Sequence, residues 1–149
     1  MKPIRCAART DLEEIVRLCA DHASYERAAH DGIGLLDRLA EALFGPAPRL
    51  MAWVVEGEAG RLLGYATATV DFSTWTGRSY VHLDCLYLDA ALRGQGYGRQ
   101  LMEVVMSQAR RAGHREVQWQ TPSWNRDAIG FYERLGGRGA AKVRFRAVV

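Results

Sequence analysis

The chain has 149 residues, 48% hydrophobic and 25% charged, which is typical of one globular domain spanning residues 1–149. Its formal net charge of +3 includes no run of five or six like charges, so we expect neither a nucleic-acid partner nor a membrane surface, and a small anionic ligand suits it better. The three cysteines form no C-x-x-C pair, and no apolar run suits a signal peptide or a membrane span, so we expect a reducing, cytoplasmic location.

Hydrophobic spacing and turn residues predict a single run of elements in the order β-α-α-β-β-β-α-β-α-β. The first helix has the form of a capping box at Thr10 to Glu13, and a Gly-containing turn at 57–60 is typical of a β-hairpin. The class is therefore α/β (α+β), with a mixed, mostly antiparallel central sheet of about six to seven strands flanked by about four helices. We expect strands at 1–9, 50–56, 62–71, 79–88, 116–121 and 143–149, and helices at 10–25, 35–43, 97–112 and 125–135.

Three glycines stand where the strand at 79–88 gives way to the helix at 97–112, in the sequence R-G-Q-G-Y-G of residues 93–98. A helix N-terminus carries unpaired N–H groups and a partial positive charge, and glycine lets a phosphate approach them. A tight strand-to-helix turn is the other interpretation of the same glycines. A P-loop is excluded because no Lys-Ser or Lys-Thr follows, and the Rossmann fingerprint fails because Arg99 stands where its third glycine belongs.

The pattern that does match is [QR]-x-x-G-x-[GA], met by Arg93, Gly96 and Gly98. With this loop and the order of its elements, the sequence resembles the GNAT superfamily of acetyl-CoA-dependent N-acetyltransferases. It is most similar to the diamine (spermidine/spermine) and thialysine acetyltransferase branch. Four segments carry this resemblance. W-T-G-R at 75–78 is similar to the branch's W-x-G-[KR], and residues 83–98 are similar to its L-E-D-x-Y-V-x-x-x-x-R-G-x-G-x-G. Residues 124–136 are similar to its W-N-x-x-A-x-x-x-Y-x-x-x-G, and S-Y-E at 24–26 is similar to the K-Y-E at the end of its first helix.

The resemblance implies a GNAT fold, acetyl-CoA as co-substrate and a homodimer, and it assigns roles to particular residues. The catalytic residues would be Tyr132, as the general acid that protonates the departing thiolate, and Asp84, as the candidate base. The amine would meet Tyr25, Glu26, Trp75 and Asp84. Coenzyme A would be bound by Leu86, Tyr87, Leu88, Arg93, Gly94, Gln95, Gly96, Tyr97, Gly98, Arg99, Asn125, Asp127 and Ala128.

The chemistry of an N-acetyl transfer requires a neutral amine, and an alkylammonium with a pKa near 10.4 costs about 4.6 kcal/mol to deprotonate at pH 7. Asp84 stands where the branch has glutamate, and being shorter it suits a bridging water better than direct proton abstraction; it also suits a charge contact with the ammonium. Strand alternation predicts two faces, one with His82, Asp84, Leu86 and Leu88, the other with Val81, Leu83, Cys85 and Tyr87.

Several of these residues have a plain structural interpretation as well. Tyr132 also suits helix packing, Asn125 an N-cap, Trp75 a packing or dimer contact, and Tyr25 and Glu26 the end of a helix. The sequence has no G-x-S-x-G serine, no activating partner for Cys85 and no metal-ligand spacing among its four histidines, so we expect direct attack by the amine and no metal.

The sequence departs from the branch where carboxylates would bind a long polycation. Cys85 replaces the second acid of L-E-D, Ser73 replaces the acid before the tryptophan, and the tail is basic at Lys142, Arg144 and Arg146. We therefore expect a small primary amine as acceptor. A protein or peptide acetyltransferase is the second hypothesis and a non-catalytic acyl-CoA-binding module the third; Asp84 and Tyr132 favour catalysis, because a binder needs neither.

Overall fold

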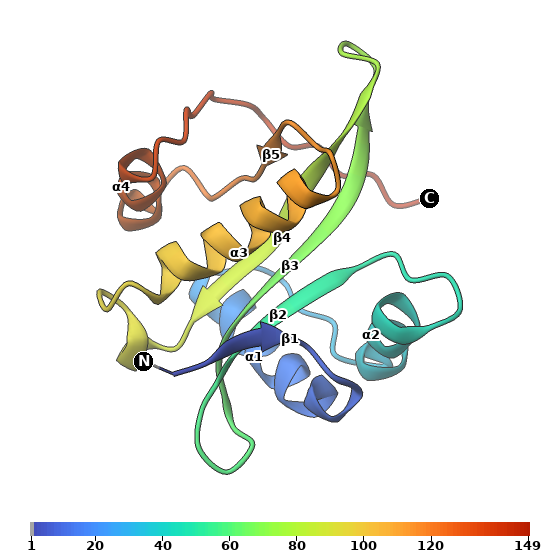
Figure 1. Cartoon of the computed structure of the whole chain (residues 1–149), viewed down its shortest axis with the longest axis vertical. Coiled ribbons are helices and arrows are strands. Elements are labelled where there is room, and N and C mark those ends of the chain that lie inside the picture. Colours follow the sequence, from blue (N-terminus) through green and yellow to red (C-terminus); the bar gives the residue numbers. More distant parts are fainter. Residues whose placement is uncertain (1) are drawn as a thin grey trace. The chain divides into compact units, whose positions relative to one another are not determined.

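The computed structural model describes residues 2–149, and within them a five-stranded mixed sheet in the order β1-β2-β3-β4-β5 organises the chain as far as Trp119 (Figure 1). Its first four strands are antiparallel, and the short β5 pairs parallel to β4. The predicted class, mixed sheet and order of helices are confirmed. The strands are β1 Ile4–Cys6, β2 Met51–Glu56, β3 Leu62–Ser73, β4 Arg78–Leu88 and β5 Val117–Gln118.

One face of the sheet is covered by α1 (Leu12–Tyr25), with α2 (Leu35–Phe44) packed beside it. Ile15 and Leu18 stand three residues apart on α1, so they share a helix face and are buried against Val54 and Tyr65 of the sheet. Both helices lie where the spacing predicts them. This packing fixes the C-terminal end of α1 close to β3 and β4.

The start of α1 differs from the capping box that the sequence predicts. Residues 9–11 form a short 3-10 turn, η1, and Asp11 occupies the N-cap position in place of Thr10. The Asp11 carboxylate accepts hydrogen bonds from the Ala8 amide at 2.7 Å and from both terminal nitrogens of Arg5 at 2.7 and 3.0 Å. The prediction was wrong because Asp11, held by the Ala8 amide and by a bidentate contact with Arg5, takes the N-cap position that the pattern assigns to Thr10.

The opposite face of the sheet is covered by α3 (Tyr97–Arg111), which packs on β3 and β4 (Figure 1). Its buried residues Leu101, Val105 and Ala109 are those that the helical spacing predicts, and Met102 joins them. Only the short 3-10 turn η2 (Ala90–Leu92) and the glycine turn separate the end of β4 from the first turn of α3. None of the described helices is long and apolar enough to cross a membrane.

The second compact unit, Gln120–Val149, contains one regular element, α4 (Arg126–Arg134). The strand predicted at 143–149 is absent, and β5 is shorter than the strand predicted at 116–121. Alternation of Val143, Phe145 and Val149 with basic residues is a genuine strand pattern. Within the described part of this unit, however, no strand edge is available to pair with it, and all three side chains are exposed. The sheet consequently has five strands, fewer than predicted.

Candidate active site

The turn between β4 and α3 presents backbone amides at a helix start whose N-cap residue has no side chain to cap them. Gly96 is the N-cap of α3 with φ 89°, Gly94 precedes it with φ 75°, and within residues 2–149 the helix start has no side-chain cap from its N-cap residue. A Cβ atom added at either glycine would have no protein atom within 4 Å. Both residues thus adopt a backbone that favours glycine, and both face open space, which is the geometry of an anion site at a helix N-terminus.

Polar contacts within the turn hold its shape. The Asp89 carboxylate accepts from the Ala91 amide at 2.9 Å, Arg93 Nε donates to the Leu88 carbonyl at 3.1 Å, and the Gln95 side-chain amide donates to the Ala91 carbonyl at 2.6 Å. Since the side chains of Arg93 and Gln95 brace the turn, the groups that it presents for a ligand are backbone amides.

The first turn of α3 is anchored in the core below these amides. Tyr97 is buried, and its hydroxyl accepts a hydrogen bond from the Lys2 amide at 2.7 Å. Gly98 is also buried, whereas Arg99 is exposed at the start of the helix. A rigid helix start keeps the amides in place for a ligand, as a pre-organised site requires.

The candidate base Asp84 lies in a β-bulge. Thr67 pairs with Cys85 and Ala68 pairs with Leu83, so Asp84 is an extra residue in β4 without a partner on β3. Its side chain is 57% exposed, and His82 Nε2 and Cys85 Sγ lie 3.9 and 3.8 Å from its two carboxylate oxygens. The carboxylate is therefore solvated and has polar neighbours, as a water-assisted base or a contact for an ammonium would need.

The bulge overturns the predicted alternation along β4. Residues paired across a sheet share a face, and Val81 and Leu83 pair on the same face of β3 as Leu86 and Leu88 do. His82 pairs on the other face, together with Cys85 and Tyr87. The prediction was wrong because one inserted residue shifts every later side chain to the opposite face.

Cys85 is not an activated nucleophile. Burial raises the pKa of its thiol to about 12, with the nearby Asp84 charge acting in the same direction. A thiol with that pKa holds its proton at neutral pH. The expectation that Cys85 lacks an activating partner agrees with this environment.

The structure brings the predicted residues Tyr25, Tyr87 and Arg93 together at the C-terminal end of α1. The Arg93 guanidinium carbon lies 4.4 Å from the ring centroid of Tyr25 and 5.5 Å from that of Tyr87, and the two rings are 6.3 Å apart. Guanidinium stacked on aromatic faces is a favourable contact. The glycine turn is in this way tied to the helix end that carries Glu26.

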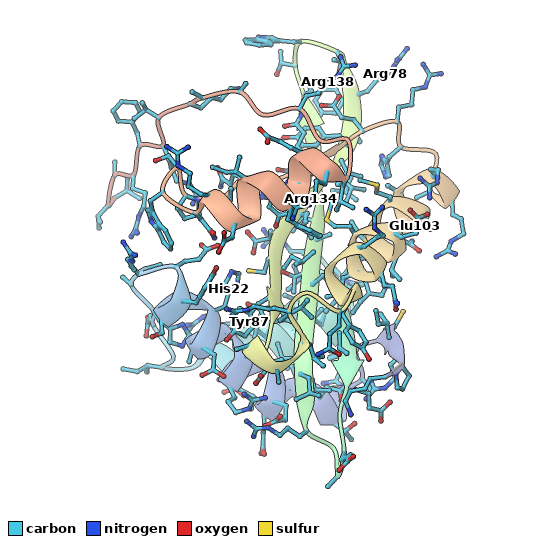
Figure 2. All side chains as sticks on the ribbon, turned by 90° about the vertical axis from the view of Figure 1, so that its left-hand side faces the viewer. His22, Arg78, Tyr87, Glu103, Arg134 and Arg138 are labelled. Atoms are coloured by element: carbon cyan, nitrogen blue, oxygen red, sulfur yellow. The ribbon has the colours of Figure 1, made fainter. Side chains whose placement is uncertain are left out.

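His22 joins this cluster although the sequence did not single it out as a site residue. Its ring lies beside that of Tyr87 (Figure 2), stacked at 5.3 Å and 26°. Its Nε2 lies 3.2 Å from a carboxylate oxygen of Glu26. The available signal was its position four residues before Glu26, since residues four apart share a helix face.

Trp75 lies apart from the cluster. It stands in the turn between β3 and β4 with 95% of its surface exposed, whereas the glycine turn follows the other end of β4. The 11 residues of β4 span about 35 Å. A contact of Trp75 with the acceptor amine therefore stays a prediction.

The second unit carries the remaining predicted residues on α4. Asn125 is buried and caps the helix, with its side-chain oxygen accepting from the Ala128 amide at 3.2 Å, and Asp127 lies in the first turn. Tyr132 stands near the end of the same helix, with its ring 5.1 Å from that of Phe131. The N-cap predicted for Asn125 is confirmed, and the coenzyme contacts of Asn125, Asp127 and Ala128 stay predictions.

A glycine-bordered helix start beside a bulged strand, on a mixed sheet with helices on both faces, agrees with the GNAT fold that the sequence resemblance implies. Residues 11–137 match the Acetyltransferase (GNAT) family, and the chain belongs to that family. It is 29% identical to the thialysine N-epsilon-acetyltransferase of Mus musculus and 30% identical to that of Sus scrofa, in each case over 91% of this chain and 83% of the relative. These relatives agree with the diamine and thialysine branch.

Solved structures show the same fold. An aminoglycoside N-acetyltransferase in complex with CoA superposes with a TM-score of 0.82 at 21% identity, covering 99% of this chain and 95% of that one. The structure of the same enzyme type with a bisubstrate analogue of CoA also gives a TM-score of 0.82 at 21% identity, over 100% and 99% of the two chains. Together with the family membership, the relatives define this chain as an acetyl-CoA-dependent N-acetyltransferase.

Proposed function

We propose that the enzyme transfers an acetyl group from acetyl-CoA to the primary amine of a small molecule, by direct attack in a ternary complex. The observation that carries this proposal is the uncapped start of α3, bordered by Gly94 and Gly96 with open space beyond both. An anionic diphosphate fits such a cradle, because the amides and the helix dipole supply positive charge and the N-cap residue has no side chain to neutralise it.

The coenzyme, when bound, supplies the acetyl group as a thioester. The amides of residues 94–99 bind its pyrophosphate, and the backbone of Leu86, Tyr87 and Leu88 pairs with its pantetheine arm. Asn125, Asp127 and Ala128 add contacts from α4. These assignments follow the family resemblance together with the open geometry of the turn.

In the transfer step, the lone pair of the neutral amine forms the C–N bond, and the C–S bond of the thioester breaks. The ammonium first loses a proton through water to Asp84, whose carboxylate is exposed and lies beside His82. The Tyr132 hydroxyl then gives its proton to the departing thiolate, and the N–H proton that the nitrogen loses on becoming an amide returns through water to the tyrosine oxygen. A thiolate is already a stable leaving group, so the tyrosine accelerates the step without being indispensable.

The acceptor is a small amine that meets Tyr25, Glu26 and Asp84, with Trp75 as a further contact. Relatives named for small amines support this class: thialysine for the animal enzymes, blasticidin S for a Streptomyces morookaense enzyme at 33% identity over 58% of this chain. The exposed position of Asp84 also leaves water within reach for proton removal.

The experiment that tests the proposal measures thiol release from acetyl-CoA with a panel of thialysine, L-ornithine, 1,4-diaminobutane and a lysine-containing peptide. We expect release with at least one small amine and a lower kcat/KM with the peptide. A preference for the peptide favours a protein acetyltransferase, and tight coenzyme binding without release for any amine refutes catalysis.

Substitution of Tyr132 by phenylalanine separates the proton donor from a packing role. We expect kcat to fall by about 10- to 100-fold, at the low end of general-acid effects because the thiolate needs little assistance. The KM for acetyl-CoA and the melting temperature should stay unchanged. A kcat equal to that of the wild type would remove Tyr132 from the mechanism.

We also propose a single N-acetyltransferase domain over residues 1–149, a homodimer and a cytoplasmic location. The family match over 11–137 crosses the boundary between the two compact units, which supports one domain. Exposed Phe145, Val148 and Val149 support an interface between subunits, and the free cysteines support a reducing compartment. Light scattering tests the dimer, which a mass of 16.6 kDa in solution would refute.

A further inference from the structure

His22 is held on several sides at the C-terminal end of α1. Its side chain is only 12% exposed, its Nδ1 lies 3.0 Å from the Tyr65 hydroxyl, and its Nε2 lies 3.2 Å from Glu26 Oε1. The ring stacks on Tyr87 (Figure 2). It also meets the edge of Tyr65 at 5.9 Å and 78°. Contacts from three different elements thus fix both the position and the rotation of this ring.

The chemistry of its two neighbours sets the direction of the hydrogen bonds. A carboxylate only accepts, so the ring carries a proton on Nε2 and donates it to Glu26. With that proton on Nε2, Nδ1 is free to accept from the Tyr65 hydroxyl, whose pKa burial raises well above its ordinary range, so that Tyr65 keeps its proton. The result is a directed chain, Tyr65 to His22 to Glu26, that begins in the core and ends at a carboxylate that is 31% exposed.

The end of α1 is an unusual place for that carboxylate. Glu26 is the C-cap of the helix, where the last carbonyl groups already provide partial negative charge, so a cation is favoured there and an anion is not. The next residue, Arg27, has φ 57°, and its amide donates to the Ser24 carbonyl while the Ala28 amide donates to the Ala23 carbonyl, which is the usual left-handed end of a helix. The Glu26 carboxylate therefore lies beside the negative end of the helix dipole, where a cationic ligand would compensate its charge.

Tyr87 connects this end of α1 with the strand that the coenzyme is expected to follow. It belongs to β4, between Leu86 and Leu88, and its ring lies against both His22 and the Arg93 guanidinium of the glycine turn. A histidine stacked on Tyr87 therefore fixes the distance from the Glu26 carboxylate to β4. An amine bound by Glu26 would be held at a set position relative to that strand.

We propose that His22 is a positioning residue that holds the Glu26 carboxylate in place to bind the ammonium group of the acceptor amine. This inference rests on the proposed function, in which Glu26 meets the amine, and it adds the residue that acts through Glu26. The bound species is a primary ammonium, recognised by a carboxylate that the Nε2 proton of His22 orients.

The test compares His22→Phe, Glu26→Gln and the double variant, in steady-state kinetics with the amine of the panel that the wild type acetylates best. Phenylalanine keeps a ring against Tyr87 and removes both hydrogen bonds. We expect each single variant to raise the KM for the amine about 10-fold, with kcat and the KM for acetyl-CoA within about two-fold of the wild type. Because His22 acts through Glu26, the double variant should be no worse than Glu26→Gln alone.

Two further variants separate positioning from folding. His22→Gln retains an amide donor for Glu26 and should restore part of the amine KM, and it carries the test if His22→Phe does not fold. His114→Phe is the matched control, because the hydrogen bond given for the His114 ring runs to the Ser79 carbonyl at 3.4 Å, away from the cluster. The kinetics of this variant should equal those of the wild type. Melting temperatures report any loss of stability separately.

The outcomes distinguish this inference from the function on which it rests. A wild-type chain that acetylates no amine refutes the proposed function, and the inference falls with it. An active wild type alongside a His22→Phe variant with normal amine KM overturns the inference alone. Additive losses in the double variant, or an increase in the KM for acetyl-CoA, would also overturn it, since His22 would then act independently of Glu26.

Discussion

Gly96 and Gly113, at the two ends of α3, allow the role of the glycine turn to be measured against an internal control. Their φ angles are 89° and 84°, and at both positions an added Cβ would meet no protein atom within 4 Å. Alanine costs about 1 to 2 kcal/mol in a left-handed backbone and regains about 0.4 to 1 kcal/mol by restricting the unfolded chain. Each substitution should therefore lower the free energy of unfolding by about 1 kcal/mol.

The two variants should differ in coenzyme binding. The methyl group of Gly96→Ala would project from the N-cap of α3, into the space where a phosphate approaches the amides, whereas Gly113 follows the C-terminal end of the helix. Loss of one amide bond to an anion is worth about 1.5 to 3 kcal/mol, which corresponds to a Kd for coenzyme A that is about 10- to 100-fold weaker. Gly113→Ala should leave that Kd unchanged.

Isothermal titration with coenzyme A and thermal unfolding of the same two preparations measure both quantities. About 1 kcal/mol corresponds to a decrease of about 2 to 4 °C in melting temperature for a chain of this size, so the two variants should melt together. Equal melting temperatures with equal Kd values would refute the reasoning. The glycines would then serve only the turn, and the diphosphate would have to be bound elsewhere.

Two predictions concern stability. Gly64→Ala should lower the free energy of unfolding in urea by about 1 to 3 kcal/mol, because the added Cβ would lie 2.6 Å from Leu88 Cδ2 and 2.9 Å from a backbone oxygen. Gly139→Ala is the control: nothing lies within 4 Å of its Cβ, so the free energy of unfolding should change by less than about 0.5 kcal/mol. Equal effects of the two substitutions would disprove the overpacking argument. The hydrogen bond from Arg17 lowers the pKa of Glu14 to about 2, so its stabilisation is present above about pH 4.5 and is lost as the pH falls towards 2. The side chains of Arg17 and Glu14 are 26% and 27% exposed, so Glu14→Gln should lower the free energy of unfolding by about 1 to 2 kcal/mol at pH 7 and by nearly nothing at pH 2. A stability difference between the variant and the wild type that does not vary with pH would contradict this.

The parts of the fold that could be predicted from the sequence are those set by local patterns. The apolar faces of α1 and α3, the Gly-containing hairpin turn and the glycine turn before α3 each depend on residues that are close in sequence. The strand at 143–149 shows the limit of such patterns. Alternation indicates that a segment suits a sheet, but a strand also needs a partner edge, and the sequence does not state where that edge lies.

The residues of the candidate site also fall into those that a local motif predicts and those that it does not. Arg93, Gly94 and Gly96 were predicted because a phosphate-binding turn is a local motif. His22 was missed because its role depends on Tyr65 of β3 and Tyr87 of β4, and no local spacing connects these strands to α1. Clusters that form between distant segments carry no periodic signal.

The bulge at Asp84 shows how one residue can decide the composition of the site. Without the inserted residue, uniform alternation would place Tyr87 on the same face as Leu83, which is the face that α3 covers. The bulge moves Tyr87 to the face of α1, where it stacks on His22, and it leaves Asp84 itself unpaired and exposed. The candidate base and the aromatic support of Glu26 therefore depend on the same local irregularity, and a change that closed the bulge would remove both together.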